Sequence, residues 1–197
     1  MTQENRWLAL LQRTGALQTG HFLLSSGLHS PQYVQCARAL EDPANAAALG
    51  AALARRLAAA DVDRVASPPL GALLIGYEVA RSLKRPFLFP ERPDGGAFSL
   101  RRGFTLRPGD RVAVIEDVVT TGRTTSELIA LLRAGGADVV ALGAIVDRSE
   151  TGAIDGLAIV SLVTLSIPTY ERATCPLCAA GALLVKPGSR TESEGIR

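Results

Sequence analysis

Apolar and polar residues along the first 60 positions follow two different periods. Residues 3–14 carry apolar side chains at helical spacing, which predicts an amphipathic helix. Segment 20–36 (GHFLLSSGLHSPQYVQC) has two short apolar runs around a Ser-Gly turn and predicts two short strands. A second helix is expected over 42–60, because Asp42 suits its N-cap and Pro43 its first position.

From residue 64 the pattern alternates regularly between strands and helices. We expect strands at 64–67, 87–89, 112–115, 139–146 and 157–165, and helices at 73–83 and 124–135. Strands separated by helices of this length predict an α/β fold with a parallel sheet and helices on both of its faces. The crossovers between the strands should be right-handed.

Composition narrows the class of protein. The 197 residues are enough for one domain, 1–197, and 47% apolar with 20% charged residues is ordinary for a globular protein. No apolar run reaches the roughly 20 residues that span a bilayer, and the amphipathic start does not resemble a signal peptide. We expect a cytoplasmic protein without a membrane partner. A net charge of +2 gives no support for a nucleic-acid partner.

Three cysteines are too few for a disulfide framework and raise the question of a metal. Cys175 and Cys178 form a CPLC segment with the spacing of half a zinc site, and a full site needs about four ligands. The other soft ligands in the chain are Cys36, His21 and His29. Metal binding and a redox CxxC pair stay open, and the spacing alone favours a tight structural turn.

Two adjacent acids end the apolar run at 112–115. Glu116 and Asp117 should lie at the carboxyl edge of the sheet, where ligands bind in such folds. Neighbouring carboxylates repel each other unless they are exposed or hold donors or a cation. Two hydroxyls on adjacent carbons of a ribose match such a pair.

The turn after the acids has the composition of an anion site. Gly122 permits a conformation that other residues resist, and the helix beginning near Thr124 directs its positive dipole end to the turn. Hydroxyls suited to phosphate oxygens come from Thr120, Thr121, Thr124 and Thr125. The chain lacks a P-loop lysine and GxGxxG at this place, so a ribose 5-phosphate fits better than a nucleoside triphosphate or a dinucleotide. The alternative is that the threonines only cap a helix.

Basic residues gather in the Pro- and Gly-rich stretch 89–110 and just after it, at Arg92, Arg101, Arg102, Arg107 and Arg111. This pattern is typical of a mobile loop that faces an anion. A solvated basic edge is the alternative.

The motif VAVIEDVVTTGRT resembles the phosphoribosyl-diphosphate signature of the type I phosphoribosyltransferases. Segments 20–40, 67–83, 90–104 and 146–152 and the tail ERATCPLCAAGALLVKPGSR are similar to parts of the orotate phosphoribosyltransferases with a shorter loop, and the resemblance covers roughly 14–190. It implies a type I core at approximately 43–165, a small hood at approximately 15–40 and an irregular tail at 166–197.

The resemblance also assigns the donor site. Glu116 and Asp117 would hold the ribose hydroxyls, and the turn would cradle the 5-phosphate. The full set for phosphoribosyl diphosphate is Glu116, Asp117, Val118, Val119, Thr120, Thr121, Gly122, Arg123 and Thr124.

For the acceptor, the resemblance implies that orotate contacts Thr120, Arg148, Ser26 and Tyr33, with Gly27 beside them. Loop 91–103 would close over a neighbouring subunit, which implies a homodimer, and Mg²⁺ would be the cofactor without an assigned protein ligand. Members with the longer loop carry lysines where this chain has Ser25, Gly71 and Arg92. Arg92 keeps a cation and is the expected catalytic residue, with Arg101 and Arg102 as alternatives.

Two other functions stay open at this point. The acceptor could be another base, a purine or uracil. The chain could also be a non-catalytic regulator that senses phosphoribosyl diphosphate, an idea that the missing lysines favour and that the near-neutral charge opposes.

Overall fold

The structure is a computed structural model that describes residues 3–187. Its strands are β1 (Leu17–Leu23), β2 (His29–Val34), β3 (Arg64–Ala66), β4 (Phe87–Leu88), β5 (Pro90–Glu91), β6 (Ser99–Leu100), β7 (Arg111–Val119), β8 (Asp138–Asp147), β9 (Ala153–Ile154) and β10 (Leu157–Thr164). Its helices are α1 (Gln3–Arg13), α2 (Ala37–Leu40), α3 (Pro43–Leu57), α4 (Leu73–Leu83), α5 (Arg123–Ala134) and α6 (Pro176–Ala179), with short 3₁₀ turns η1 (Ala58–Ala60), η2 (Pro93–Gly95) and η3 (Arg172–Thr174).

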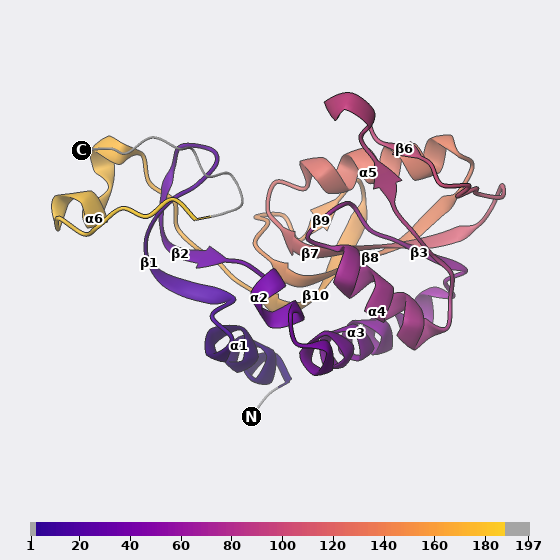
Figure 1. Ribbon diagram of the computed structural model, residues 1–197, viewed down its shortest axis with the longest axis horizontal. Coiled ribbons are helices and arrows are strands. Elements are labelled where there is room, and N and C mark those ends of the chain that lie inside the picture. The colour runs from indigo at the N-terminus through magenta and orange to yellow at the C-terminus, as the bar shows by residue number, and fades with distance from the viewer. Residues whose placement is uncertain (1–2, 188–197) are drawn as a thin grey trace.

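A six-stranded sheet in the order β4-β3-β7-β8-β10-β9 forms the centre of the core. All neighbouring pairs are parallel except β9 and β10, which are antiparallel. Helices α3 and α4 cover one face and α5 covers the other (Figure 1). The predicted α/β fold with helices on both faces is therefore confirmed, with one antiparallel strand at its edge.

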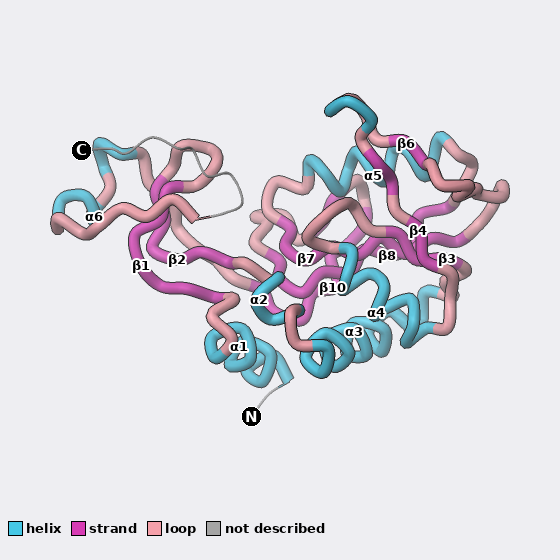
Figure 2. Tube along the Cα trace, viewed as in Figure 1, coloured by secondary structure: helices cyan, strands magenta, loops and turns pink. Residues whose placement is uncertain are grey.

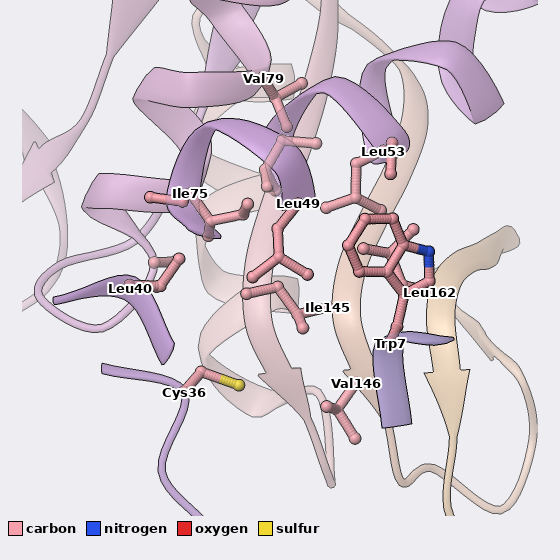
Figure 3. Packing of buried hydrophobic residues seen from close by; sticks show 14 of the residues in the cluster. Trp7, Cys36, Leu40, Leu49, Leu53, Ile75, Val79, Ile145, Val146 and Leu162 are labelled. Atoms are coloured by element: carbon pink, nitrogen blue, oxygen red, sulfur yellow. The ribbon is translucent and has the colours of Figure 1, made fainter. Parts of the chain in front are cut away.

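Two apolar clusters fill the space on either side of the sheet. On the α3 and α4 side, Trp7, Leu53 and Ile75 come from three helices and pack with the strand residues Ile145 and Leu162 (Figure 3). On the other side, residues of α5 pack against β7 and β8, among them Leu128, Ile129 and Leu132. Burial on both faces explains why the central strands read as near-continuous apolar runs.

Helix boundaries follow the capping signals in the sequence. The Asp42 side chain accepts a hydrogen bond from the amide of Ala44 at 2.8 Å, and Pro43 is the first residue of α3. Helix α5 begins after Gly122, which has a left-handed conformation, and Gly135 closes its other end. These three ends were predicted to within a residue, whereas α3 ends at Leu57, three residues before the expected end, and the 3₁₀ turn η1 follows it.

Strand β7 differs from its expected bounds. It runs on through both acids to Val119, four residues past the predicted end at 115. The reason is pairing: Val118 lies opposite Val146 and Val119 opposite Asp147 in the parallel ladder with β8. The acids therefore lie within a paired strand, and the turn begins only at Thr120.

The Pro- and Gly-rich stretch is more ordered than its composition suggests. Strands β5 and β6 pair as an antiparallel hairpin around η2. This hairpin projects beyond the rest of the core (Figure 2).

Strands β1 and β2 form a separate antiparallel hairpin within the segment at approximately 15–40 that was expected to form the hood. The end of the described chain returns to it. Tyr170 pairs with His29 and Val185 with Phe22, and α6 lies beside the hairpin (Figure 1). An irregular tail was expected here, whereas residues 170 and 185 pair with the hood and the segment between them contains a short helix. Residues 188–197 lie outside the described chain. In the described part, no helix is long and apolar enough to cross a membrane.

Candidate active site

A cavity of about 230 Å³ opens where the chain leaves β3 and β7. Its walls are the turn that follows β3 and the continuous segment from the end of β7 into α5. The lining residues are Pro68, Pro69, Gly71, Ala72, Glu116, Asp117, Val118, Val119, Thr120, Thr121, Gly122, Arg123, Thr124 and Thr125. All nine positions expected to bind phosphoribosyl diphosphate therefore line one cavity.

Glu116 is buried at the wall of this cavity. Only 6% of the residue is exposed, and Thr125 Oγ1 donates a hydrogen bond to its Oε1 at 2.9 Å. Burial, and then the neighbouring charge of Asp117, raise the pKa of Glu116 to about 8, although the Thr125 bond opposes the shift. A carboxylate with so few partners of its own is suited to accept donors from a ligand.

Asp117 lies beside the turn that follows β3. Burial raises the pKa of Asp117 as well. A Cβ atom on Gly71 would lie 2.8 Å from Asp117 Oδ2, so this turn approaches the acid as closely as only glycine permits. Cys36 lies beneath it, with Sγ 3.7 Å from the Asp117 carbonyl oxygen. Asp117, near the end of β7, therefore lies against the turn after β3, which forms the opposite wall of the cavity.

The turn after β7 requires glycine for two reasons. Gly122 has a φ of +71°, and a Cβ atom there would lie 2.1 Å from Ile154 Cδ1. The left-handed residue turns the chain directly into α5, whose first amides then face the cavity. The hydroxyl of Thr125 was expected to donate to phosphate. This expectation is wrong, because that hydroxyl donates to Glu116 instead.

Arg148 follows β8 at the same edge of the sheet. Its amide donates to the Val119 carbonyl oxygen at 2.8 Å, next to Thr120. The side chain is half-buried, its Nε is fully buried without a hydrogen-bond partner, and burial lowers its pKa. A buried guanidinium nitrogen without an acceptor indicates a place for an anionic or carbonyl oxygen of a ligand.

The hood residues do not line the cavity in this structure. Ser26 is exposed at the tip of the hairpin, and Gly27 turns the chain there with a φ of +84°. Tyr33 on β2 is nearer the acids: burial, and then the charge of Asp117, raise its pKa. The structure therefore brings Tyr33 towards the acids and leaves Ser26 apart from them.

Arg92 does not line the cavity either. Its guanidinium binds both carboxylate oxygens of Glu127 on α5, with Nη1 to Oε1 at 2.7 Å, and lies over the ring of Phe98 at 3.8 Å from the centroid. Arg102 is paired with Glu91. Within residues 3–187, the exposed side chain of Arg101 has no ion-pair or hydrogen-bond partner.

The predicted set of binding residues contained none from the turn after β3, although Gly71 in that turn had been matched to a lysine position of the longer-loop members. Pro68, Pro69, Gly71 and Ala72 line the cavity together with the predicted residues. The available signal was the SPPLG composition directly after a predicted strand, because turns at the carboxyl ends of parallel strands surround the ligand.

A scan of protein-family models gives no match. The chain is 50% identical over 182 residues to the orotate phosphoribosyltransferase of Thermotoga maritima, covering 92% of this chain and 96% of that relative. It is 46% identical over 192 residues to that of Sphingopyxis alaskensis, covering 95% and 97%. The crystal structure of orotate phosphoribosyltransferase from Aeropyrum pernix is similar with a TM-score of 0.67 and 30% identity, covering 80% of this chain and 92% of that one. The predicted signature residues line one cavity, and the two relatives are 50% and 46% identical over most of this chain. The chain therefore belongs to the orotate phosphoribosyltransferase family.

Proposed function

We propose that this protein transfers the 5-phosphoribosyl group of phosphoribosyl diphosphate to orotate, giving orotidine 5′-phosphate and diphosphate. The observation that carries the proposal is the cavity, in which two carboxylates adjoin an anion-binding turn. Ribose hydroxyls on the acids and a phosphate on the turn fit one ribose 5-phosphate. The step belongs to pyrimidine nucleotide synthesis and is expected in the cytoplasm.

The residues of the turn bind the 5-phosphate in this proposal. Amides of residues 120–124 and the hydroxyls of Thr120, Thr121 and Thr124 donate to phosphate oxygens, and the positive end of the α5 dipole adds to the attraction. Glu116 and Asp117 accept from the two ribose hydroxyls. This arrangement fixes the sugar while its anomeric carbon stays open to attack.

Arg148 binds orotate in this proposal. Its buried Nε lacks an acceptor, and orotate offers a carboxylate and carbonyl oxygens of matching geometry. Thr120, at the junction of the two half-sites, contacts both substrates. Tyr33 and the Ser26–Gly27 turn complete the base pocket when the hood approaches the core.

The donor set of the cavity fits Mg²⁺, which enzymes of this family use with phosphoribosyl diphosphate. Mg²⁺ prefers hard oxygen ligands and keeps several waters, so it would be held through phosphate oxygens and waters, while Glu116 and Asp117, bound to the ribose hydroxyls, would add negative charge beside it. When bound, the ion neutralises charge on the diphosphate as that group leaves. The protein's own part is to hold the sugar and the base in line for attack.

Arg92 is the proposed catalytic cation that stabilises the departing diphosphate. Its pair with Glu127 is partly exposed, with 37% and 32% of the two side chains accessible, so giving it up costs little when the loop closes. Arg101, which forms no ion pair within the described residues, is the second candidate for the catalytic cation.

A homodimer is part of the proposal, with loop 91–103 reaching the neighbouring site. Three large apolar side chains near the cavity support it, because Leu70, Leu74 and Tyr77 are 82%, 55% and 57% exposed at one end of α4. Such a cluster is typical of a surface that another subunit covers.

Mixing two inactive variants tests loop action between subunits. An Arg92→Ala protein and a Glu116→Gln/Asp117→Asn protein, unfolded together and refolded, should regain up to about one quarter of wild-type activity, because half of the dimers are hybrids with one intact site. No recovery would show that each loop serves its own subunit.

The reaction itself is tested by following the ultraviolet absorbance of orotate with phosphoribosyl diphosphate and Mg²⁺. The proposal requires the orotate signal to fall, while adenine, hypoxanthine and uracil in parallel assays stay unchanged. A reaction only with one of those bases would move the substrate to a purine or uracil. Binding of phosphoribosyl diphosphate without any reaction would support a regulator.

A further inference from the structure

Four soft metal ligands meet between the hood and the returning chain. His21, His29, Cys175 and Cys178 place one ligand atom each within 4.8 Å of all the others. The two histidines belong to β1 and β2, and the two cysteines flank the start of α6. None of the four lines the cavity of the candidate active site.

We propose that His21, His29, Cys175 and Cys178 form a tetrahedral structural zinc site that fastens the chain after β10 to the hood. Two histidines and two cysteines with a CxxC spacing are one of the donor sets that structural zinc uses. Nothing in the proposed phosphoribosyl transfer requires these residues.

The distances match this geometry. Zinc bonds of about 2.0–2.1 Å to nitrogen and about 2.3 Å to sulfur place nitrogen and sulfur ligands roughly 3.5 Å apart in a tetrahedron. In the structure, His29 Nδ1 is 3.3 Å from Cys178 Sγ, and His21 Nε2 is 3.6 and 3.7 Å from Cys175 Sγ and Cys178 Sγ. The two ring nitrogens are 2.8 Å apart, so they must separate by about half an ångström to reach the roughly 3.3 Å of such a site.

The hydrogen bond of His21 fixes the tautomer that a metal requires. Its Nδ1 lies 2.9 Å from the carbonyl oxygen of Ala182, which can only accept, so Nδ1 carries the proton. In the neutral ring Nε2 then keeps a free lone pair, and that atom faces His29 and both sulfurs. Ligating histidines commonly donate their other N–H to a carbonyl in this way.

Charge and burial also favour a divalent cation. His21, His29 and Cys175 are 4%, 2% and 3% exposed, and Cys178 is partly exposed. Two thiolates and two neutral imidazoles around Zn²⁺ sum to zero charge, which suits a buried place. Binding then releases the two thiol protons to the solvent.

The site would join segments that are far apart in the sequence. Backbone bonds already link them: His29 N–H to Tyr170 O at 2.8 Å and Val185 N–H to His21 O at 2.8 Å. A two-stranded hairpin has little stability on its own, and a metal bound to both strands and to α6 offsets this.

Metal content of the purified reduced protein, without a histidine tag, tests the proposal. We expect about one zinc per chain, and less than about 0.2 in Cys178→Ser and His21→Asn. Cys36→Ala is the matched control, because Cys36 is buried outside the cluster and should leave the zinc content unchanged. Equal loss of zinc in Cys36→Ala and Cys178→Ser would overturn the assignment.

Cobalt gives a second measurement that does not depend on variants. Metal-free wild-type protein titrated with Co²⁺ should reach saturation at about one ion per chain, with thiolate-to-cobalt charge-transfer bands and intense visible d–d bands of a tetrahedral site. Zinc should displace the cobalt and raise the midpoint of thermal unfolding by at least about 5 °C. A reduced protein that binds neither ion, or that shows octahedral cobalt without charge-transfer bands, would refute the proposal.

Discussion

Thr125 donates a hydrogen bond of 2.9 Å to Glu116, and both side chains are buried. The bond joins the first turn of α5 to the cavity end of β7. It aims one carboxylate oxygen of Glu116 at the helix and leaves the other for a ligand. The pKa of Glu116 is about 8, even with this bond, because burial and Asp117 outweigh it.

Binding of phosphoribosyl diphosphate should therefore depend on pH between about 7 and 9. The ribose hydroxyls donate to the ionised carboxylate, so affinity should rise with pH, by at most about tenfold per unit, and level off above a pKa of about 8. Titration calorimetry at several pH values measures this. The Glu116→Gln protein is the control, and a slope in that variant equal to that of the wild type would exclude Glu116 as its source.

Removing the Thr125 hydroxyl should shift this profile. Thr125→Val loses the hydrogen bond that lowers the pKa of Glu116, so the affinity should level off at a higher pH than in the wild type. Thr125→Ser keeps a hydroxyl and should retain the wild-type profile. If the Thr125→Val and Thr125→Ser proteins show the same pH profile, the Thr125 hydroxyl does not set the pKa of Glu116.

The raised pKa of Glu116 should also make the stability of the protein depend on pH. Between 4.5 and about 8, the unfolded chain has Glu116 ionised while the folded protein keeps it protonated. The folded state then binds more protons, so the free energy of unfolding falls as pH rises through this window, by on the order of a few kcal/mol. Urea unfolding of the wild type and of Glu116→Gln measures this effect: the stability of the wild type relative to the variant should fall steadily as the pH rises through this window. Parallel pH profiles would contradict the assignment.

Sequence patterns predicted most of this fold, and for identifiable reasons. Helix α3 has the Asp42 cap and α5 lies between two glycines, and α3, α4 and α5 share an amphipathic period; all of these are local properties of the chain. The end of β7 was misplaced because acids normally stop a strand, whereas here pairing of Val118 and Val119 with β8 extends it.

The parts of the site that were missed depend on distant contacts. The hydrogen bond of Thr125 to Glu116 and the approach of Gly71 to Asp117 are tertiary contacts that no spacing reveals. His21 and Cys175 are 154 positions apart, so the zinc hypothesis could not be assembled from the CPLC spacing alone.

Gly71 should be required for the position of Asp117. Alanine there would place Cβ 2.8 Å from the carboxylate, so Gly71→Ala should weaken phosphoribosyl diphosphate binding by about tenfold or more. The KM for orotate should change little. In an Asp117→Ala background the same substitution meets no carboxylate and should have no further effect. Additive losses would mean that Gly71 acts elsewhere.

Arg148 should control binding of the acceptor. Its buried Nε has no acceptor in the free protein, and Arg148→Ala should raise the KM for orotate by roughly 10- to 100-fold while leaving the KM for phosphoribosyl diphosphate near the wild-type value. Arg148→Lys should not restore the affinity, because an ammonium lacks the planar fork. Steady-state kinetics with each substrate varied in turn measures both constants. An equal rise in both would place Arg148 outside the base site.

Arg92→Ala and Arg101→Ala should differ in their effect on turnover. Arg92→Ala should lower kcat by about 30- to 1,000-fold, equivalent to about 2–4 kcal/mol of lost transition-state stabilisation, with a smaller effect on KM. Arg101→Ala should lower kcat by less than about tenfold. Glu127→Gln removes the charge from the partner of Arg92 and weakens the pair, so it should not reduce kcat. The reverse ranking of the two arginines would make Arg101 the catalytic cation.

Dependence of product formation on the acid pair tests the central claim most directly. Orotidine 5′-phosphate is quantified by chromatography after incubation of orotate, phosphoribosyl diphosphate and Mg²⁺ with the wild type or with Glu116→Gln/Asp117→Asn, after circular dichroism has shown that both are folded. The wild type should form the product, and the double variant should form it at less than about one hundredth of that rate, because uncharged amides replace both carboxylates that accept from the ribose hydroxyls. No product from the wild type, or equal rates from both proteins, would contradict the proposal that this cavity transfers the phosphoribosyl group.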